Sequence, residues 1–72
     1  MPKLPGVRPK EAQKALLKAG FLFVRQKGSH RLYTKDDFTV TIAFHNKDLK
    51  PKTLKQIIKQ SGLEVKDFLK LL

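Results

Sequence analysis

The stretch FTVTIAFH, residues 38–45, constrains the fold of this chain more than any other feature of the sequence. Four apolar side chains recur at every second position: Phe38, Val40, Ile42 and Phe44. The residue that follows each of them is polar or small: Thr39, Thr41, Ala43 and His45. Successive side chains of a strand point to opposite faces, and an apolar face needs a second layer to cover it. We therefore predict a half-buried antiparallel strand over residues 38–45, packed against helices.

Prolines and glycines mark the beginnings and ends of two helices. Pro9 and Pro51 suit the first position of a helix, where the missing N–H costs nothing, and Gly20 and Gly62 suit its end. Between these residues, side chains recur at helical spacing on one face: Ala12, Ala15, Leu16 and Ala19, then Leu54, Ile57, Ile58 and Ser61. The pattern predicts a loose lead-in and three helices, the last one short: lead-in 1–7, helices 9–19, 51–61 and 65–72.

Two further strands are predicted between the first helix and residue 38. Residues 21–26, FLFVRQ, and residues 30–34, HRLYT, are rich in aromatic and β-branched side chains. Gly28 and Ser29 predict a turn or bulge between them, and residues 35–37 predict a second turn. The expected fold is a two-layer α+β domain over residues 1–72. Its α-β-β-β-α order, with a short C-terminal helix, is that of the double-stranded RNA-binding domain.

Charge and cysteine content narrow the possible functions. The chain of 72 residues has 16 Lys and Arg against 6 Asp and Glu, a net charge of +10, which favours nucleic acid or an acidic protein as a partner. The alternative is a lysine-rich surface that only keeps the protein soluble. The absence of cysteine excludes disulfides, thiolate nucleophiles and cysteine-based zinc sites. We found neither a secretory signal nor an apolar run near the roughly 20 residues of a membrane span, so we expect a cytoplasmic protein that does not bind membranes.

The stretch QKGSHRLY, residues 26–33, is the strongest candidate for a functional site. The ordinary pKa of histidine is about 6.5, so His30 can accept a proton at neutral pH. Lys27 and Arg31 flank it and could hold a phosphate. Gly28 lets the backbone approach a ligand closely, and Ser29 could donate a hydrogen bond to a phosphate oxygen. The alternative is a hairpin turn with a solvated histidine.

The second histidine and the carboxylates offer less. His45 could be a second acid, an RNA contact or a strand-end histidine, and we favour the last. His30 shares a strand face with Leu32 while His45 lies opposite Phe44, so the two histidines need not converge. Asp36 and Asp37 sit in a turn without a third carboxylate, and the histidines have no zinc-binding spacing. We therefore expect no metal and no cofactor.

An ordered set of short motifs resembles one known family. The motifs are AGF (19–21), VRQKGSH (24–30), VTIAFH (40–45), TLKQIIKQSGL (53–63) and VKDFLKLL (65–72). In this order and spacing they resemble the HicA-type toxins, the small mRNA-cleaving partners of HicA/HicB toxin–antitoxin modules. The chain departs from the family pattern in three places. Ala43-Phe44 replaces the usual proline before the second histidine, Lys52 replaces a glycine, and Glu64 replaces a Ser or Thr helix cap.

The resemblance implies a fold, an activity and a partner. It implies a double-stranded RNA-binding-like fold, metal-independent cleavage of mRNA with His30 as the catalytic residue, and an acidic HicB-type antitoxin that occupies the RNA site. The main alternative is a non-catalytic RNA-binding module, in which Lys50, Lys52 and Lys55 near the start of the second helix follow the phosphates. We also predict that the lysines on the outer face of this helix bind RNA: Lys52, Lys55 and Lys59. A second alternative is a protein–protein adaptor whose basic surface serves only an acidic partner.

Overall fold

The computed structural model describes residues 6–72, so the first five residues of the predicted lead-in lie outside the described residues. The helices and strands follow in the order α1 (Pro9–Lys18), β1 (Leu22–Lys27), β2 (His30–Lys35), β3 (Phe38–Ala43), α2 (Pro51–Ser61) and α3 (Val65–Lys70). This order confirms the predicted α+β fold with a short C-terminal helix.

The main difference from the predicted boundaries is at the end of β3. The strand ends at Ala43 and not at residue 45, so Phe44 and His45 belong to the loop before α2. Phe44 still donates its backbone N–H to the Ser29 oxygen, at 2.7 Å. The last helix likewise ends at Lys70, two residues before the predicted end.

Two tight hairpins form an antiparallel sheet in the order β1-β2-β3. Lys27 lies opposite His30, so Gly28 and Ser29 form a two-residue turn, and Gly28 has a φ of 59°. Such loops need a left-handed residue to match the twist of the sheet, and glycine adopts that conformation without steric cost. Of the two predicted alternatives, a turn or a bulge, the structure has the turn. A separate irregularity in the pairing of β1 lies between Phe23 and Arg25.

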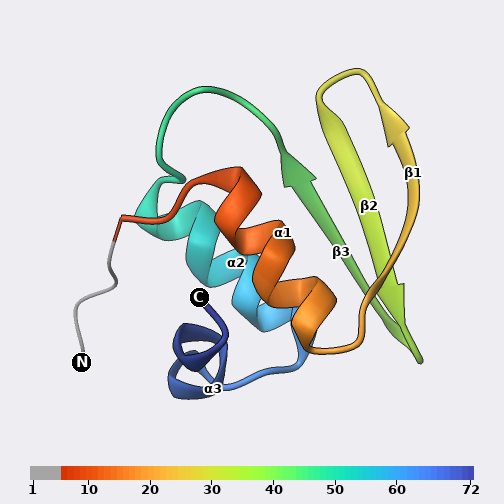
Figure 1. Cartoon of the computed structure of the whole chain (residues 1–72), viewed down its shortest axis with the longest axis vertical. Helices are drawn as coiled ribbons and strands as arrows, with labels where there is room; N and C mark the ends of the chain where they lie inside the picture. Colours follow the sequence, from red (N-terminus) through yellow and green to blue (C-terminus); the bar gives the residue numbers. More distant parts are fainter. Residues whose placement is uncertain (1–5) are drawn as a thin grey trace.

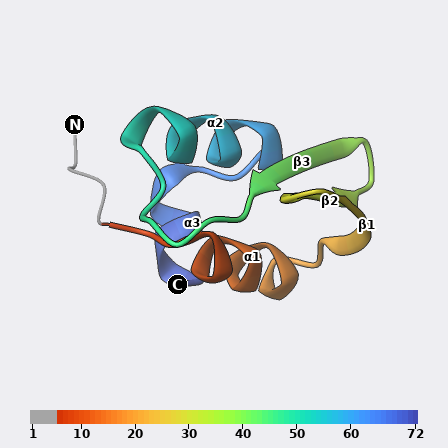
Figure 2. The ribbon, with the colours of Figure 1, turned by 90° about the horizontal axis from the view of Figure 1, so that it is seen from above.

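One face of the sheet is covered by helices, as the alternation in β3 predicts. The two long helices lie beside the sheet in Figure 1, with α3 below them, and Figure 2 shows α1 and α2 on either side of the short α3. Tyr33, Val40 and Ile42 are buried on the covered face. The helices contribute most of the remaining core: Ala12, Ala15, Leu16, Leu54, Ile57, Ile58 and Phe68. None of the helices formed by residues 6–72 covers the other face of the sheet, so side chains on that face can meet a ligand.

The end of α1 positions the first strand. Gly20 has a φ of 101°, and the N–H groups of Gly20 and Phe21 donate to the oxygens of Leu17 and Leu16, at 3.1 and 3.0 Å. This pattern closes a helix with a left-handed glycine. The ammonium of Lys35 on β2 donates to the Ala19 oxygen at 2.6 Å, which ties the same helix end to the sheet. Within residues 6–72, the helices are all too short or too polar to cross a membrane.

Candidate functional site

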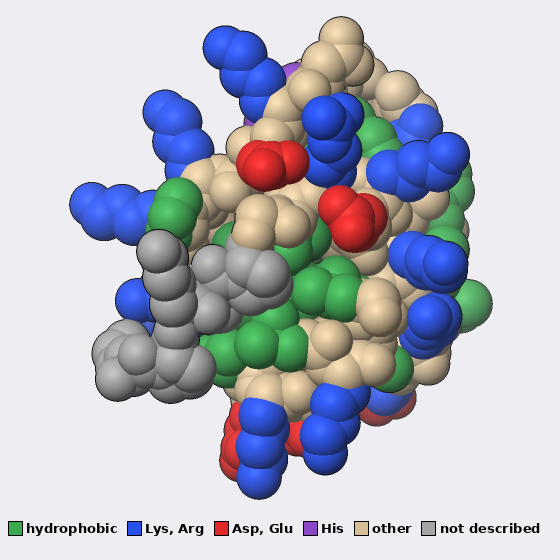
Figure 3. Space-filling view, turned by 60° about the vertical axis from the view of Figure 1, so that its left-hand side comes forward, with side chains coloured by type: hydrophobic (Ala, Val, Ile, Leu, Met, Phe, Trp, Pro, Cys, Tyr) green, Lys and Arg blue, Asp and Glu red, His purple; other side chains and the backbone are tan. Residues whose placement is uncertain are grey.

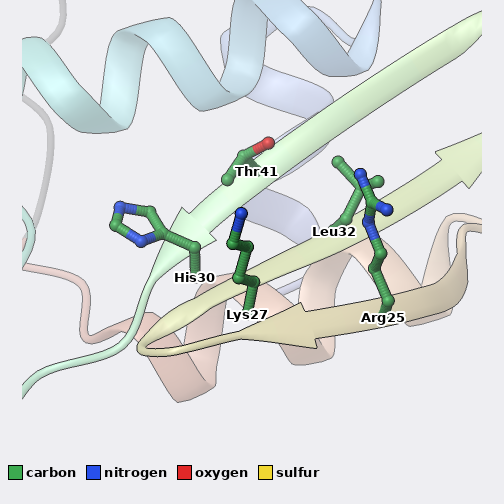
Figure 4. A pocket seen from close by; sticks show the side chains of 5 residues that line it. All are labelled: Arg25, Lys27, His30, Leu32 and Thr41. Atoms are coloured by element: carbon green, nitrogen blue, oxygen red, sulfur yellow. The ribbon is translucent and has the colours of Figure 1, made fainter.

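A hollow on the uncovered face of the sheet surrounds His30. It is lined by Arg25, Lys27, His30, Leu32 and Thr41, which come from all three strands (Figure 4). The register brings them together, because Lys27 lies opposite His30, Arg25 opposite Leu32, and Leu32 opposite Thr41. Side chains paired across antiparallel strands share a face, so the hollow follows from strand pairing alone.

The turn before β2 holds His30 in place through its backbone. The Gln26 side chain donates to the Gly28 oxygen at 2.9 Å on one side of the turn. The hydrogen bond from Phe44 to Ser29 fixes the other side. A Cβ added at Gly28 would meet nothing within 4 Å, so glycine serves here for its positive φ and not for lack of space. His30 itself is exposed at the first position of the strand.

Two cations and an imidazole give the hollow its chemical character. Figure 4 shows the Lys27 side chain between His30 and Arg25, with Thr41 across from it on β3. No carboxylate is among the residues that line this hollow in the described part of the chain. Its volume of about 140 Å³ is below the roughly 300–1,000 Å³ that is usual for pockets binding whole small molecules. The hollow therefore suits one anionic group, such as a phosphate, beside a proton acceptor.

Arg31 lies on the other face of the sheet. It pairs with Ile42 of the covered face. Its Nη1 donates to the Gln13 Oε1 on α1 at 2.8 Å, and its guanidinium carbon stands 4.0 Å from the centre of the Phe44 ring. The sequence placed Lys27 and Arg31 on both flanks of His30, and the structure brings only Lys27 to the histidine. Successive residues of a strand face opposite sides of the sheet, so the adjacent positions of His30 and Arg31 in the predicted strand already indicated that their side chains diverge.

A second hollow contains Arg31. Eight residues line it, from α1 and the residue before it, from β2 and from the loop after β3: Arg8, Pro9, Lys10, Gln13, Arg31, Phe44, His45 and Asn46. His45 accepts a hydrogen bond on Nδ1 from the Lys47 backbone N–H, at 3.3 Å. His30 and His45 thus line different hollows. Strand parity is not the cause, because His30 lies opposite Ala43 and the strand ends there, so the loop after β3 decides where His45 lies.

Tyr33 connects the second hollow to the core. Its ring is fully buried, and its hydroxyl donates to the same Gln13 oxygen that accepts from Arg31. Burial raises the pKa of Tyr33, and the hydrogen bond and positive charge of Arg31 partly oppose that rise. Gln13 is therefore shared by two donors from neighbouring positions on the covered face of β2, which restrains the position of the Arg31 guanidinium.

The three lysines assigned to the outer face of α2 are exposed as expected. Lys52, Lys55 and Lys59 are open to solvent, whereas the apolar residues of that helix are buried. They line neither of the two hollows. Lys and Arg side chains spread over much of the face in Figure 3, so positive charge by itself does not mark one site.

The described residues also bear on metal binding. Within residues 6–72 there is no cluster of three or more His, Asp or Glu side chains that could hold a metal ion. The chemical groups of the first hollow are therefore an imidazole, an ammonium, a guanidinium and a hydroxyl, from His30, Lys27, Arg25 and Thr41.

A comparison with known protein families gives a match over most of the chain. A family model described as the HicA toxin of bacterial toxin–antitoxin systems matches residues 9–63, about three-quarters of the chain. The matched range runs from the first residue of α1 past the end of α2, and it includes every residue that lines the His30 hollow. A comparison with curated proteins finds no match.

Proposed function

The chain belongs to the HicA family of toxins from bacterial toxin–antitoxin systems, and we propose that it is an endoribonuclease that cleaves mRNA. The family match confirms the resemblance seen in the motifs, and membership implies an antitoxin partner. One observation carries the proposal of ribonuclease activity. An exposed histidine stands beside two cations in a hollow of phosphate-like size on the uncovered face of the sheet.

The proposed reaction uses the 2′-hydroxyl of the RNA as the nucleophile. The neutral His30 imidazole accepts the proton of that hydroxyl, and the oxygen attacks the adjacent phosphorus. The bond from phosphorus to the 5′-oxygen breaks, and the 5′-oxygen takes up a proton. The products are a 2′,3′-cyclic phosphate and a 5′-hydroxyl. Lys27 and Arg25 stabilise the negative charge that grows on the phosphate oxygens in the transition state.

A test of this mechanism needs only purified protein and a defined RNA. We expect cleavage to continue in EDTA, and a 2′-deoxy substitution at the cut site to abolish it. The cut RNA should end in a 2′,3′-cyclic phosphate. Loss of activity in EDTA with recovery on adding magnesium, or cleavage of the deoxy substrate, would contradict the mechanism. RNA that binds and stays intact would favour the non-catalytic RNA-binding module, whose lysines on α2 are exposed.

We also propose how the antitoxin acts on this protein. An acidic HicB-type protein would cover the His30 hollow and compete with RNA in the cytoplasm, because the hollow is exposed and positively charged. Co-expression of the antitoxin should relieve growth arrest, and the purified complex should not cleave RNA. A complex that cleaves at the rate of the free protein would place the interface away from His30.

A further inference from the structure

Arg31 is a half-buried cation that has no counterion among the residues that the structure describes. Neither of the ion pairs found among residues 6–72 includes it: one joins Arg8 to Asp48 and the other Lys66 to Glu64. Its Nε is buried and has no hydrogen-bond partner in the described structure. Removing a charge from water is costly unless an opposite charge compensates, and an arginine has five N–H donors to satisfy. Gln13 and Phe44 hold the group, but neither neutralises it.

The hollow around Arg31 gathers more positive charge. Arg8 and Lys10 line it at the beginning of α1, and His45 lines it from the loop after β3. Its lining includes no Asp or Glu within the described residues. Two carboxylates lie nearby, both bonded to Arg8: Asp48 at 3.6 Å from the Arg8 Nε, and Glu11, which accepts from its backbone N–H at 3.1 Å. The cations thus face the hollow while the acids lie outside it.

The size and polar lining of this hollow differ from those of the His30 site. Its volume is about 410 Å³, within the roughly 300–1,000 Å³ of sites that bind whole small molecules. Asn46 adds a side-chain amide, which donates and accepts hydrogen bonds as base edges do. Gln13 adds the N–H groups of its amide, because its oxygen already accepts from Arg31 and Tyr33. The combination suits a unit with a phosphate and a polar ring, whereas the smaller hollow suits a phosphate alone.

The two hollows lie at the same end of the sheet. His30 and Arg31 are consecutive, and Ala43, which lies opposite His30, precedes Phe44 of the second hollow. Figure 1 shows that the beginning of α1 and the end of β3 are on this side of the molecule, away from α3. A single strand of RNA that bends around the edge formed by the beginning of β2 and the end of β3 can therefore reach both hollows.

We propose that the Arg31 hollow is a second RNA subsite, which binds a nucleotide next to the one that is cut. Arg31 and Lys10 hold its phosphate, and the amides of Gln13 and Asn46 face its base. The proposal rests on the proposed ribonuclease function, because it places the bound nucleotide next to the one that is cut. Binding of RNA at this hollow does not itself require cleavage.

The test compares three substitutions in a His30→Ala background, where the RNA stays intact. Arg31→Gln and Lys10→Gln each remove one charge from the hollow, and Lys70→Gln removes the same charge from the exposed surface of α3. Fluorescence anisotropy measures the affinity for a single-stranded RNA of about 12 nucleotides, a length within the usual site sizes of such proteins. The titration is repeated over a range of salt concentrations.

We expect Arg31→Gln and Lys10→Gln each to weaken RNA binding about tenfold, the value of one charge-assisted hydrogen bond. The slope of log affinity against log salt should decrease by about 0.7 for each phosphate that the protein no longer neutralises, and Lys70→Gln should change neither quantity. Lys10 is exposed, so Lys10→Gln decides the matter if Arg31→Gln does not fold.

Two results would overturn the subsite. The first is that the Arg31→Gln and Lys10→Gln proteins have the same RNA affinity and salt slope as the Lys70→Gln protein. The second is that they keep RNA affinity but lose affinity for the antitoxin, which would assign the hollow to an acidic protein. The ribonuclease proposal can fail separately. If the protein with His30 intact does not cleave RNA, but Arg31→Gln and Lys10→Gln still weaken RNA binding, the ribonuclease activity is refuted and the subsite is not.

Discussion

His30 and Arg31 are neighbours in the sequence, yet they line two hollows on opposite faces of the sheet. His30 is exposed, and no hydrogen bond from its side chain is found within residues 6–72. Arg31 is half-buried, bonded to Gln13 and stacked on Phe44. A group that exchanges protons benefits from access to water and substrate, whereas a group that anchors a ligand benefits from being held still. The contrast indicates reaction in one hollow and binding in the other.

The largest expected effect is the loss of His30, and the second histidine serves as its control. We expect His30→Ala to lower the cleavage rate at saturating RNA by at least about 100-fold, the lower end of what a general base contributes. His45→Ala should change that rate by no more than a few-fold, because His45 lines the Arg31 hollow and not the His30 hollow. Single-turnover kinetics measures both, with circular dichroism to confirm folding. A folded His30→Ala protein that cleaves at the normal rate would refute the assignment of His30.

The two cations that flank His30 in the sequence should separate in their kinetic effects. Lys27→Gln should lower the rate at saturating RNA about tenfold, because its charge is needed most in the transition state. Arg31→Gln should leave that rate unchanged and raise the RNA concentration at half-maximal rate about tenfold. Initial rates over a range of RNA concentrations distinguish the two. If both substitutions act on the same parameter, the division into a reacting and a binding hollow is wrong.

A smaller effect is expected from the lysines on α2, which lie outside both hollows. The triple substitution of Lys52, Lys55 and Lys59 by Gln should weaken RNA binding a few-fold, with little dependence on sequence. The salt slope should fall by about 0.7 to 0.9 for each of these lysines that binds a phosphate. Lys66→Gln with Lys70→Gln on α3 provides a control at a distant helix. An unchanged salt slope would restrict RNA to the sheet and its two hollows.

The smallest effect concerns Tyr33, the only tyrosine of the chain. Burial raises its pKa in the folded protein, so the unfolded chain, with an ordinary value of about 10, ionises first as the pH rises. The stability from this group is complete below about pH 10 and is lost as the pH rises through the folded pKa. Tyr33→Phe should therefore lose less stability between about pH 9 and about pH 11 than the parent protein. Urea unfolding at both pH values tests this, and equal losses in the two proteins would contradict it.

The helices and strands could be predicted because their causes are local. Alternation over residues 38–45 required a covered strand, and Val40 and Ile42 are indeed buried. Prolines and glycines marked the helix boundaries, because their backbone limits act within a few residues. The end of β3 was placed two residues too late. Alternation continues through Phe44 and His45, although regular pairing with β2 ends where the turn begins at Ser29.

Composition, spacing and turn residues by themselves determined the α+β order, the place of His30 directly after a turn and the exposed lysines on the outer face of α2. Only the tertiary structure decided which side chains meet. A two-residue turn set Lys27 opposite His30, and strand pairing then added Arg25, Leu32 and Thr41. Packing of α1 against the other face drew Arg31 to Gln13. Local pattern cannot supply these contacts, since register and helix docking depend on residues far apart in the chain, whose packing energies select one arrangement among many.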